Sequence, residues 1–297
     1  MYRILGSLRG RPEGVQNADG DGCMQIKGRH ALVTGGSHGI GVDIAKEFSR
    51  RGAAVTVLGR DAERLSAVAE SINGNWFSLD LADEGAVADA IGQVEAAHGP
   101  VDILVNNAAL ALVRGAGEYD PGDARRLMMV NSIAPMELVR QVLPGMFNRG
   151  RGHIVNVSSL AGVSAVPDMA IYCASKAALH HYTAVLQREL QRDRSPVGAT
   201  LVTFGEVAGT HMMEQARQSP IIAAVSARLA RSRILPMITA ADAARAVADA
   251  VHQQAQYIAV PRRLAAIIGL RNLPSRLQDV ALIGLKAQAT SVGVRSD

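Results

Sequence analysis

Short apolar runs alternate with longer helical stretches along most of this chain, and that alternation limits the possible fold more than any other feature. Seven runs have the character of buried strands, at residues 31–34, 54–58, 76–79, 103–105, 154–157, 199–203 and 257–260. Helical stretches lie at about 40–51, 61–72, 83–98, 122–148, 171–192 and 240–253. Strands that are apolar on both faces and separated by helices predict a parallel sheet that is covered on both sides. With right-handed crossovers this becomes a doubly wound (Rossmann) α/β fold with a seven-stranded parallel sheet and helices on both faces.

The pattern predicts a single domain at residues 25–260, because no internal repeat or long linker interrupts it. Residues 1–24 are rich in glycine and predict a flexible leader, in which Met24 is a candidate for the true start. Residues 205–237 break the rhythm beside the carboxyl ends of the strands and predict a lid. Residues 261–297 predict an amphipathic C-terminal extension.

Composition narrows the classes of function. Hydrophobic residues make up 48% and charged residues 20% of the chain, as in a soluble protein with a full core. The net charge is only +4 and aromatic residues are 3%, so we expect no nucleic-acid partner. No apolar run reaches the ~18–20 residues that span a membrane. Cys23 and Cys173 lack metal-ligand spacing, so we expect no bound metal and a reducing, cytoplasmic location.

The C-terminal extension mixes large aliphatic residues with arginines, and Pro274 is expected to divide it into two helical pieces. Two interpretations remain open. The extension packs on its own domain or on another subunit, or it makes peripheral contact with an anionic membrane. We favour packing on protein, and we expect a homo-oligomer, either a dimer or a tetramer.

Two motifs follow strands of the expected sheet. Residues 34–41 read Thr-Gly-Gly-Ser-His-Gly-Ile-Gly, and glycines there would let the backbone approach a pyrophosphate at the N-terminus of the next helix. Residues 106–109 read Asn-Asn-Ala-Ala and directly follow the fourth strand, where small and amide side chains can line a cofactor crevice. Each motif alone is also compatible with an ordinary turn.

A third group of residues follows the fifth strand. Tyr172 and Lys176 are four residues apart, so on a helix they share one face. An ammonium beside a phenol is expected to lower the phenol's pKa from ~10, which suits proton transfer to or from a carbonyl or alcohol oxygen. The hydroxyl of Ser159 could hold the same oxygen. Taken alone, a tyrosine and a lysine at this spacing are more often a pair on a helix surface. Together with the glycine motif, they favour a catalytic interpretation.

In this order, the motifs resemble those of the short-chain dehydrogenase/reductase family, over about residues 28–260. The resemblance implies a nicotinamide-dependent oxidoreductase. It implies that Tyr172 is the proton donor or acceptor, that Ser159 binds the substrate oxygen, and that Lys176 binds a ribose and lowers the pKa of Tyr172. Asn131 would anchor a water that relays protons.

The resemblance also implies cofactor-binding residues, which lie in the motifs and at the ends of the strands: Gly35, Ser37, His38, Gly39, Ile40, Gly41, Arg60, Asp80, Leu81, Asn107, Ala108, Tyr172, Lys176, Val207 and Thr210. Two departures from the family pattern are present. Ala109 stands where a glycine is common, and Phe204 takes a proline position in a segment that is one residue longer.

The end of the second strand indicates which nicotinamide cofactor binds. The family's diol-binding acid would align with Gly59, which has no side chain, while Arg60 can pair with a 2′-phosphate. His38 could add a second phosphate contact, and Asp61 is expected to cap the following helix. We therefore favour NADP(H), with NAD(H) as the alternative.

Candidate substrate-pocket residues are apolar, and they predict a lipid-like carbonyl compound: Leu110, Ala111, Leu160, Val163, Met169, Met212 and Met213. His211 could touch a polar group of the substrate. The sequence thus predicts a carbonyl reductase for an apolar ketone or aldehyde, acting reversibly. Its rivals are a catalytically idle NADP-binding scaffold or sensor, and a membrane-associated interaction protein.

Overall fold

The computed structural model describes residues 23–210 and 237–264, together with residues 213, 214, 217, 219, 220, 222, 223, 226 and 227. The leader up to residue 22, most of the expected lid, and the extension from residue 265 onward lie outside the described residues, as do His211 and Met212. Met24 is buried, and its N–H donates to the carbonyl of His252 at 2.8 Å, so the packed chain already includes Met24.

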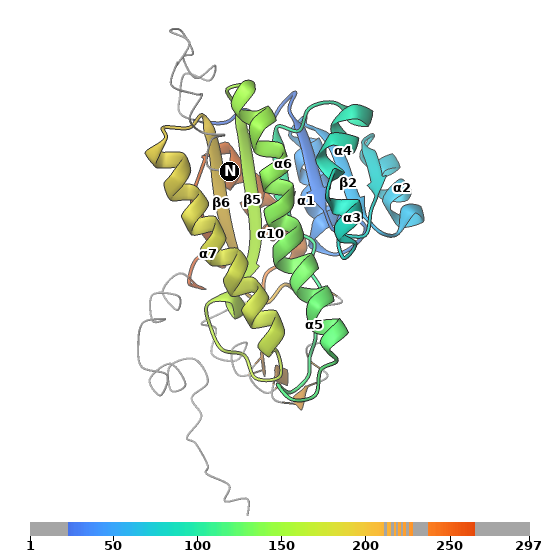
Figure 1. Ribbon diagram of the computed structural model, residues 1–297, viewed down its shortest axis with the longest axis vertical. Helices are drawn as coiled ribbons and strands as arrows, with labels where there is room; N and C mark the ends of the chain where they lie inside the picture. Colours follow the sequence, from blue (N-terminus) through green and yellow to red (C-terminus); the bar gives the residue numbers. More distant parts are fainter. Residues whose placement is uncertain are drawn as a thin grey trace, which may run out of the picture.

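Seven parallel strands form one sheet in the order β3-β2-β1-β4-β5-β6-β7 (Figure 1). Their bounds are β1 His30–Thr34, β2 Ala54–Gly59, β3 Asn75–Ser78, β4 Ile103–Asn106, β5 Gly152–Ser159, β6 Val197–Phe204 and β7 Tyr257–Val260. The order reverses between β1 and β4, as in other doubly wound sheets. The predicted fold class is therefore confirmed.

Helices cover both faces of the sheet, and each face has its own apolar core (Figure 1). On one face lie α1 (Ile40–Arg50), α2 (Ala62–Ser71) and α10 (Ala240–His252). On the other lie α4 (Ala90–His98), α6 (Ala134–Asn148) and α7 (Ala170–Arg192). The Asp61 side chain accepts from the Arg64 N–H at 3.1 Å, which confirms the predicted cap of α2.

The helix predicted over residues 83–98 is wrong in one respect, because it is two helices. α3 (Glu84–Val87) ends before α4 begins, and the side chain of Gln141 on α6 bonds to both ends of the break. Its amide N–H donates to the carbonyl of Val87 at 2.7 Å, and its oxygen accepts from the N–H of Ile91 at 3.0 Å. A side chain distant in sequence therefore replaces the backbone hydrogen bonds that an unbroken helix would make.

The helix predicted over residues 122–148 has a wider turn inside it. α5 (Pro121–Met128) leads into the π-helical turn η1 (Met129–Ile133), and α6 follows directly. Asn131 lies in this turn and is completely buried. π-Helical turns are frequent at functional sites, and this one places Asn131 against the loop that follows β4.

Thr34 joins the two central strands where the strand order reverses. Its hydroxyl donates to the carbonyl of Val105 and accepts from the N–H groups of Asn107 and Ala108, at 3.0 and 3.1 Å. The Asn107 amide N–H donates back to the carbonyl of Thr34 at 3.0 Å. These bonds fix the crevice between the ends of β1 and β4.

Among the described residues, no helix is both long enough and apolar enough to cross a bilayer.

Candidate active site

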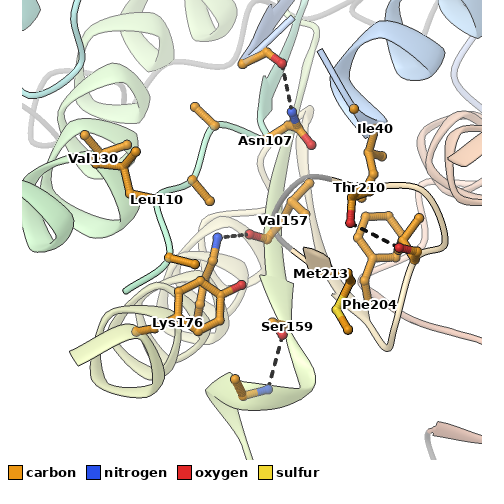
Figure 2. A pocket seen from close by; sticks show the side chains of 18 of the residues that line it. Ile40, Asn107, Leu110, Val130, Val157, Ser159, Lys176, Phe204, Thr210 and Met213 are labelled. Atoms are coloured by element: carbon orange, nitrogen blue, oxygen red, sulfur yellow. Dashed lines mark hydrogen bonds between the residues drawn. The ribbon is translucent and has the colours of Figure 1, made fainter. Parts of the chain in front are cut away.

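A cavity of about 1050 Å³ lies at the carboxyl ends of the strands. Segments that follow β1 to β6 all contribute to its wall, so residues far apart in the sequence meet there. Figure 2 shows Lys176 and Leu110 on one side of this cavity and Thr210 and Met213 on the other.

Most of the residues predicted from the sequence line this one cavity: Gly35, Ser37, His38, Gly39, Ile40, Arg60, Asp80, Leu81, Asn107, Ala108, Ser159, Tyr172, Lys176, Val207 and Thr210. Gly41 and Asn131 are predicted site residues that do not line it.

The glycine turn packs too closely to admit side chains at its centre. A Cβ on Gly41 would lie 2.1 Å from the carbonyl oxygen of Gly35, and a Cβ on Gly35 would lie 2.8 Å from Cα of Ala108. Gly39, with φ 61°, precedes α1 and faces open space. The turn therefore leaves the N-terminus of α1 open toward the cavity, which is the arrangement that binds phosphate groups.

The end of β2 leaves room for a side chain that the sequence lacks. A Cβ on Gly59 would make only ordinary contacts, at 3.5 Å from Leu65 and 3.6 Å from the Ser37 hydroxyl. The Ser37 hydroxyl is hydrogen-bonded to Nδ1 of His38 at 2.7 Å. Arg60 lines the cavity beside this gap and is exposed. The cavity wall therefore carries a guanidinium at position 60 and no side chain at position 59.

Arg126 on α5 is a wall residue that sequence reasoning missed. Its Nη2 donates to the Asp80 carboxylate at 2.8 Å, and the other oxygen of Asp80 accepts from the Ala82 N–H at 2.9 Å. Burial alone would raise the pKa of Asp80, but these hydrogen bonds bring it below its ordinary value. Arg126 follows no motif and lies 46 residues from its partner, so only the fold identifies the pair.

Tyr172, Ser159 and Lys176 meet at the other end of the cavity. Tyr172 and Lys176 are both buried on α7, with Nζ of the lysine 6.0 Å from the centre of the tyrosine ring. Nζ donates to the carbonyl of Val157 at 2.9 Å, as Figure 2 shows. The Ser159 hydroxyl accepts from the Ala161 N–H at 3.2 Å and is hydrogen-bonded to the side chain of Tyr172.

Burial, rather than the neighbouring charge, dominates the titration of this group. It raises the pKa of Tyr172 to about 12, against the lowering effect of the bond with Ser159, and it lowers the pKa of Lys176 to about 8. The expected lowering of the tyrosine pKa is therefore wrong for the chain by itself, because desolvation disfavours both charged forms. At neutral pH, Tyr172 is a protonated phenol beside a lysine that still carries its charge.

Asn131 is held on both sides by hydrogen bonds from its side chain. Its side-chain oxygen accepts from the N–H of Leu110, and its amide donates to the carbonyl of Leu110, both at 2.8 Å. The second amide hydrogen goes to the Ser175 hydroxyl at 3.0 Å. Both amide hydrogens are used in joining the loop after β4 to α7, so the side chain could hold a water only as an acceptor, and the water-anchoring role stays a prediction.

The longer segment after β6 still brings its predicted residues to the cavity. Phe204 is buried as the last residue of β6, and Val207 pairs with Ile238. Gly209 has φ 71°, a conformation that glycine adopts without strain, and the Thr210 hydroxyl then donates to the carbonyl of Val207 at 3.1 Å.

The wall next to Tyr172 is largely apolar. Leu110, Ala111, Leu160, Met169 and Met213 line it as predicted, whereas Val163 does not. Ile222 is an apolar wall residue that sequence reasoning missed.

Glu206 is a polar wall residue that was also missed. Its carboxylate accepts from the Ser226 hydroxyl and lies 3.5 Å from the guanidinium of Arg217. Its partners lie 11 and 20 residues further along the chain, so no local sequence pattern indicates the role of Glu206.

Comparison with known proteins places the chain among enzymes with this architecture. A family model described as short chain dehydrogenase matches residues 29–220. A fatty acyl-CoA reductase of Mycobacterium tuberculosis is 33% identical over 261 residues, which cover 85% of this chain and 83% of that protein.

Two solved structures resemble the fold. A metagenomic short-chain oxidoreductase in complex with NADP is 33% identical, with a TM-score of 0.64, over 80% of this chain and 96% of that one. A short chain dehydrogenase/reductase of Burkholderia phymatum in complex with NAD has a TM-score of 0.72 over 88% of this chain and 96% of that one. At 24% identity, the second supports the fold alone.

We expect Arg126→Ala to weaken binding of 2′,5′-ADP, the adenosine half of NADP, about two- to fivefold, because an exposed ion pair contributes ~0.2–1 kcal/mol. The reason is that Asp80 loses the partner that orients its carboxylate at the cavity wall. Isothermal titration calorimetry measures the change. Arg125→Ala on the same helix is the control, because Arg125 does not line the cavity. An equal loss of 2′,5′-ADP affinity in Arg126→Ala and Arg125→Ala would contradict the role of Arg126 in orienting Asp80.

Proposed function

The chain belongs to the short-chain dehydrogenase family, and from this premise we propose that it is an NADP(H)-dependent reductase of apolar, lipid-like ketones or aldehydes. The observation that carries the proposal is a single cavity with Ser159, Tyr172 and Lys176 at one end and Arg60 at the other. Beside Tyr172 lies a wall of aliphatic and methionine side chains.

The residues present fit a nicotinamide dinucleotide. Bound there, the cofactor supplies the hydride that reduces a carbonyl carbon. We assign the glycine turn to the pyrophosphate, because the N-terminus of α1 opens there. Asp80 and Leu81 would hold the adenine, Val207 and Thr210 the carboxamide, and Lys176 with Tyr172 the nearby ribose.

We assign the preference for NADP(H) to the end of β2. A carboxylate at position 59 would bind the two hydroxyls of an adenosine ribose and would repel a 2′-phosphate. Gly59 has no side chain, and the guanidinium of Arg60 can pair with phosphate in a bidentate manner. The NADP complex of a relative that is 33% identical is consistent with this preference.

Tyr172 is the proton donor in this proposal. Burial raises the pKa of Tyr172 to about 12, so its hydroxyl still carries, at neutral pH, the proton that carbonyl reduction requires. Ser159, already bonded to Tyr172, would hold the same carbonyl oxygen. The positive charge of Lys176 would stabilise the phenolate that forms when the proton leaves. Asn131 is assigned a positioning role, because it joins Leu110 to α7.

The substrate class follows from the wall. Leu110, Met169 and Ile222 offer no charge to a sugar or phosphate, while methionine adapts to chains of irregular shape. A relative that is 33% identical over 85% of this chain is named as a fatty acyl-CoA reductase, and the fatty acyl chain in that name is apolar.

Replacing Tyr172 by Phe should lower kcat for decanal reduction by about 10²–10⁴-fold, since the ring stays but the proton is lost. The loss of NADPH absorbance follows the reaction, and calorimetry should show that NADPH still binds. Wild-type turnover in the variant would remove Tyr172 from the mechanism. Cofactor binding with no turnover of any aldehyde by the unmodified enzyme would favour the idle scaffold instead.

The cofactor preference should respond to two substitutions. Arg60→Ala should reduce the preference for NADPH over NADH by about one to two decades, because a hydrogen bond to a charged group is worth ~1.5–3 kcal/mol. Gly59→Asp should then favour NADH, since the gap beside Ser37 accommodates a Cβ without displacement. Titrations of both cofactors measure this. Equal affinities in the unmodified enzyme would contradict the proposal.

Reduction should slow as the pH rises through about 8, where Lys176 loses its proton. The rate falls rather than rises because burial lowers the pKa of Lys176 to this range. The positive charge that stabilises the phenolate of Tyr172 is therefore present below this pH and absent above it. Tyr172 retains its proton across the same range. A pH profile of kcat with saturating NADPH measures the fall, and a rate that stays level or rises there would contradict the role of Lys176.

A further inference from the structure

Asp168 lies just before α7, and its backbone is held in an uncommon conformation. Its φ is 62°, in the left-handed region that residues other than glycine seldom adopt, although aspartate tolerates it better than most. Such a conformation persists where surrounding contacts hold it in place, and it is frequent near ligand sites.

The contacts that hold Asp168 come from two other loops. Its carbonyl accepts from the N–H of Arg114 at 2.7 Å, in the loop after β4. Its carboxylate accepts from the hydroxyl of Ser219 at 2.8 Å, in the segment after β6. The Ser219 oxygen in turn accepts from the N–H of Ile222 at 3.4 Å. One aspartate therefore joins three chain segments, including its own.

These same three segments build the apolar wall beside Tyr172. Met169 and Ile222 pack with Tyr172 in one buried cluster, and Leu110 and Val113 pack against it. Leu110, Met169 and Ile222 also line the cavity, whereas Asp168 itself does not. Asp168 therefore does not face the cavity. It contacts the chain segments that carry the wall residues.

We propose that Asp168 is a positioning residue for the substrate: it couples the loops after β4, β5 and β6 so that they form one continuous apolar wall. This inference rests on the proposed reductase function and deepens it. The wall segments would separate if either bond of Asp168 were lost, and substrates with long chains would lose more contact than short ones.

The test uses kinetics with hexanal, octanal, decanal and dodecanal. Asp168→Gly keeps the backbone conformation but removes the carboxylate, whereas Ser219→Ala removes both the bond to Asp168 and the bond from the Ile222 N–H. Each should raise KM for dodecanal about tenfold, the change expected for one hydrogen bond to a charged group, with a smaller rise for hexanal. The kcat and the Kd of NADPH should stay close to those of the unmodified enzyme.

Asp168→Asn should restore the low KM, because its side-chain oxygen still accepts from Ser219 and asparagine also tolerates this φ. The double variant Asp168→Gly with Ser219→Ala should be no worse than either single variant. Ser71→Ala, which removes a hydroxyl on α2 over the opposite face of the sheet, is the control. A KM rise that is equal for all chain lengths, or an Asn variant as impaired as the Gly variant, would overturn the proposal.

Amide hydrogen exchange tests the coupling without any turnover. In Ser219→Ala the N–H of Arg114 should exchange faster, although its own bond is to Asp168 and not to Ser219. Unchanged exchange at Arg114 would overturn the coupling. If no aldehyde is reduced by the unmodified enzyme, the proposed function fails while this measurement still decides the role of Asp168.

Discussion

The hydrogen bonds of Thr34 to the end of β4 are the constraint on which the cavity depends. They hold the two central strands together where the strand order reverses, with the glycine turn on one side and Asn107 on the other. A Cβ on Gly41 would lie within 2.7 Å of the Asn107 amide, so the helix after β1 approaches this junction as closely as atoms allow. The N-terminus of α1 and the loop after β4 are therefore fixed by one junction.

Burial determines the chemistry at the other end of the cavity. A phenol and an ammonium on adjacent turns would favour each other's charged forms in water, but here both are removed from solvent. Each consequently moves toward its neutral form, the tyrosine more completely than the lysine. The result is a proton donor with a nearby charge that can respond when the proton leaves.

Sequence patterns predicted what local chemistry determines. The strands, the cap at Asp61 and the shared helix face of Tyr172 and Lys176 follow from apolar periodicity, capping preference and helical spacing, whereas Ser159 is placed with them by the family resemblance. What could not be predicted depends on contacts between distant segments. Gln141 breaks a helix 50 residues away, and Arg126 orients Asp80 across the cavity. The pKa of Tyr172 could not be predicted for the same reason. The sequence spacing shows that Lys176 is a neighbour, but it does not show how far both side chains are removed from solvent.

Transfer of deuterium from the cofactor to the product tests the central claim most directly. The unmodified enzyme would be given decanal and NADPH carrying deuterium at the reactive face of its nicotinamide ring, and the alcohol would be analysed by mass spectrometry. The account predicts decanol with one deuterium on the carbinol carbon, and unlabelled decanol from the epimer of NADPH that is labelled on the opposite face. Decanol without the cofactor's deuterium from either labelled form would contradict it.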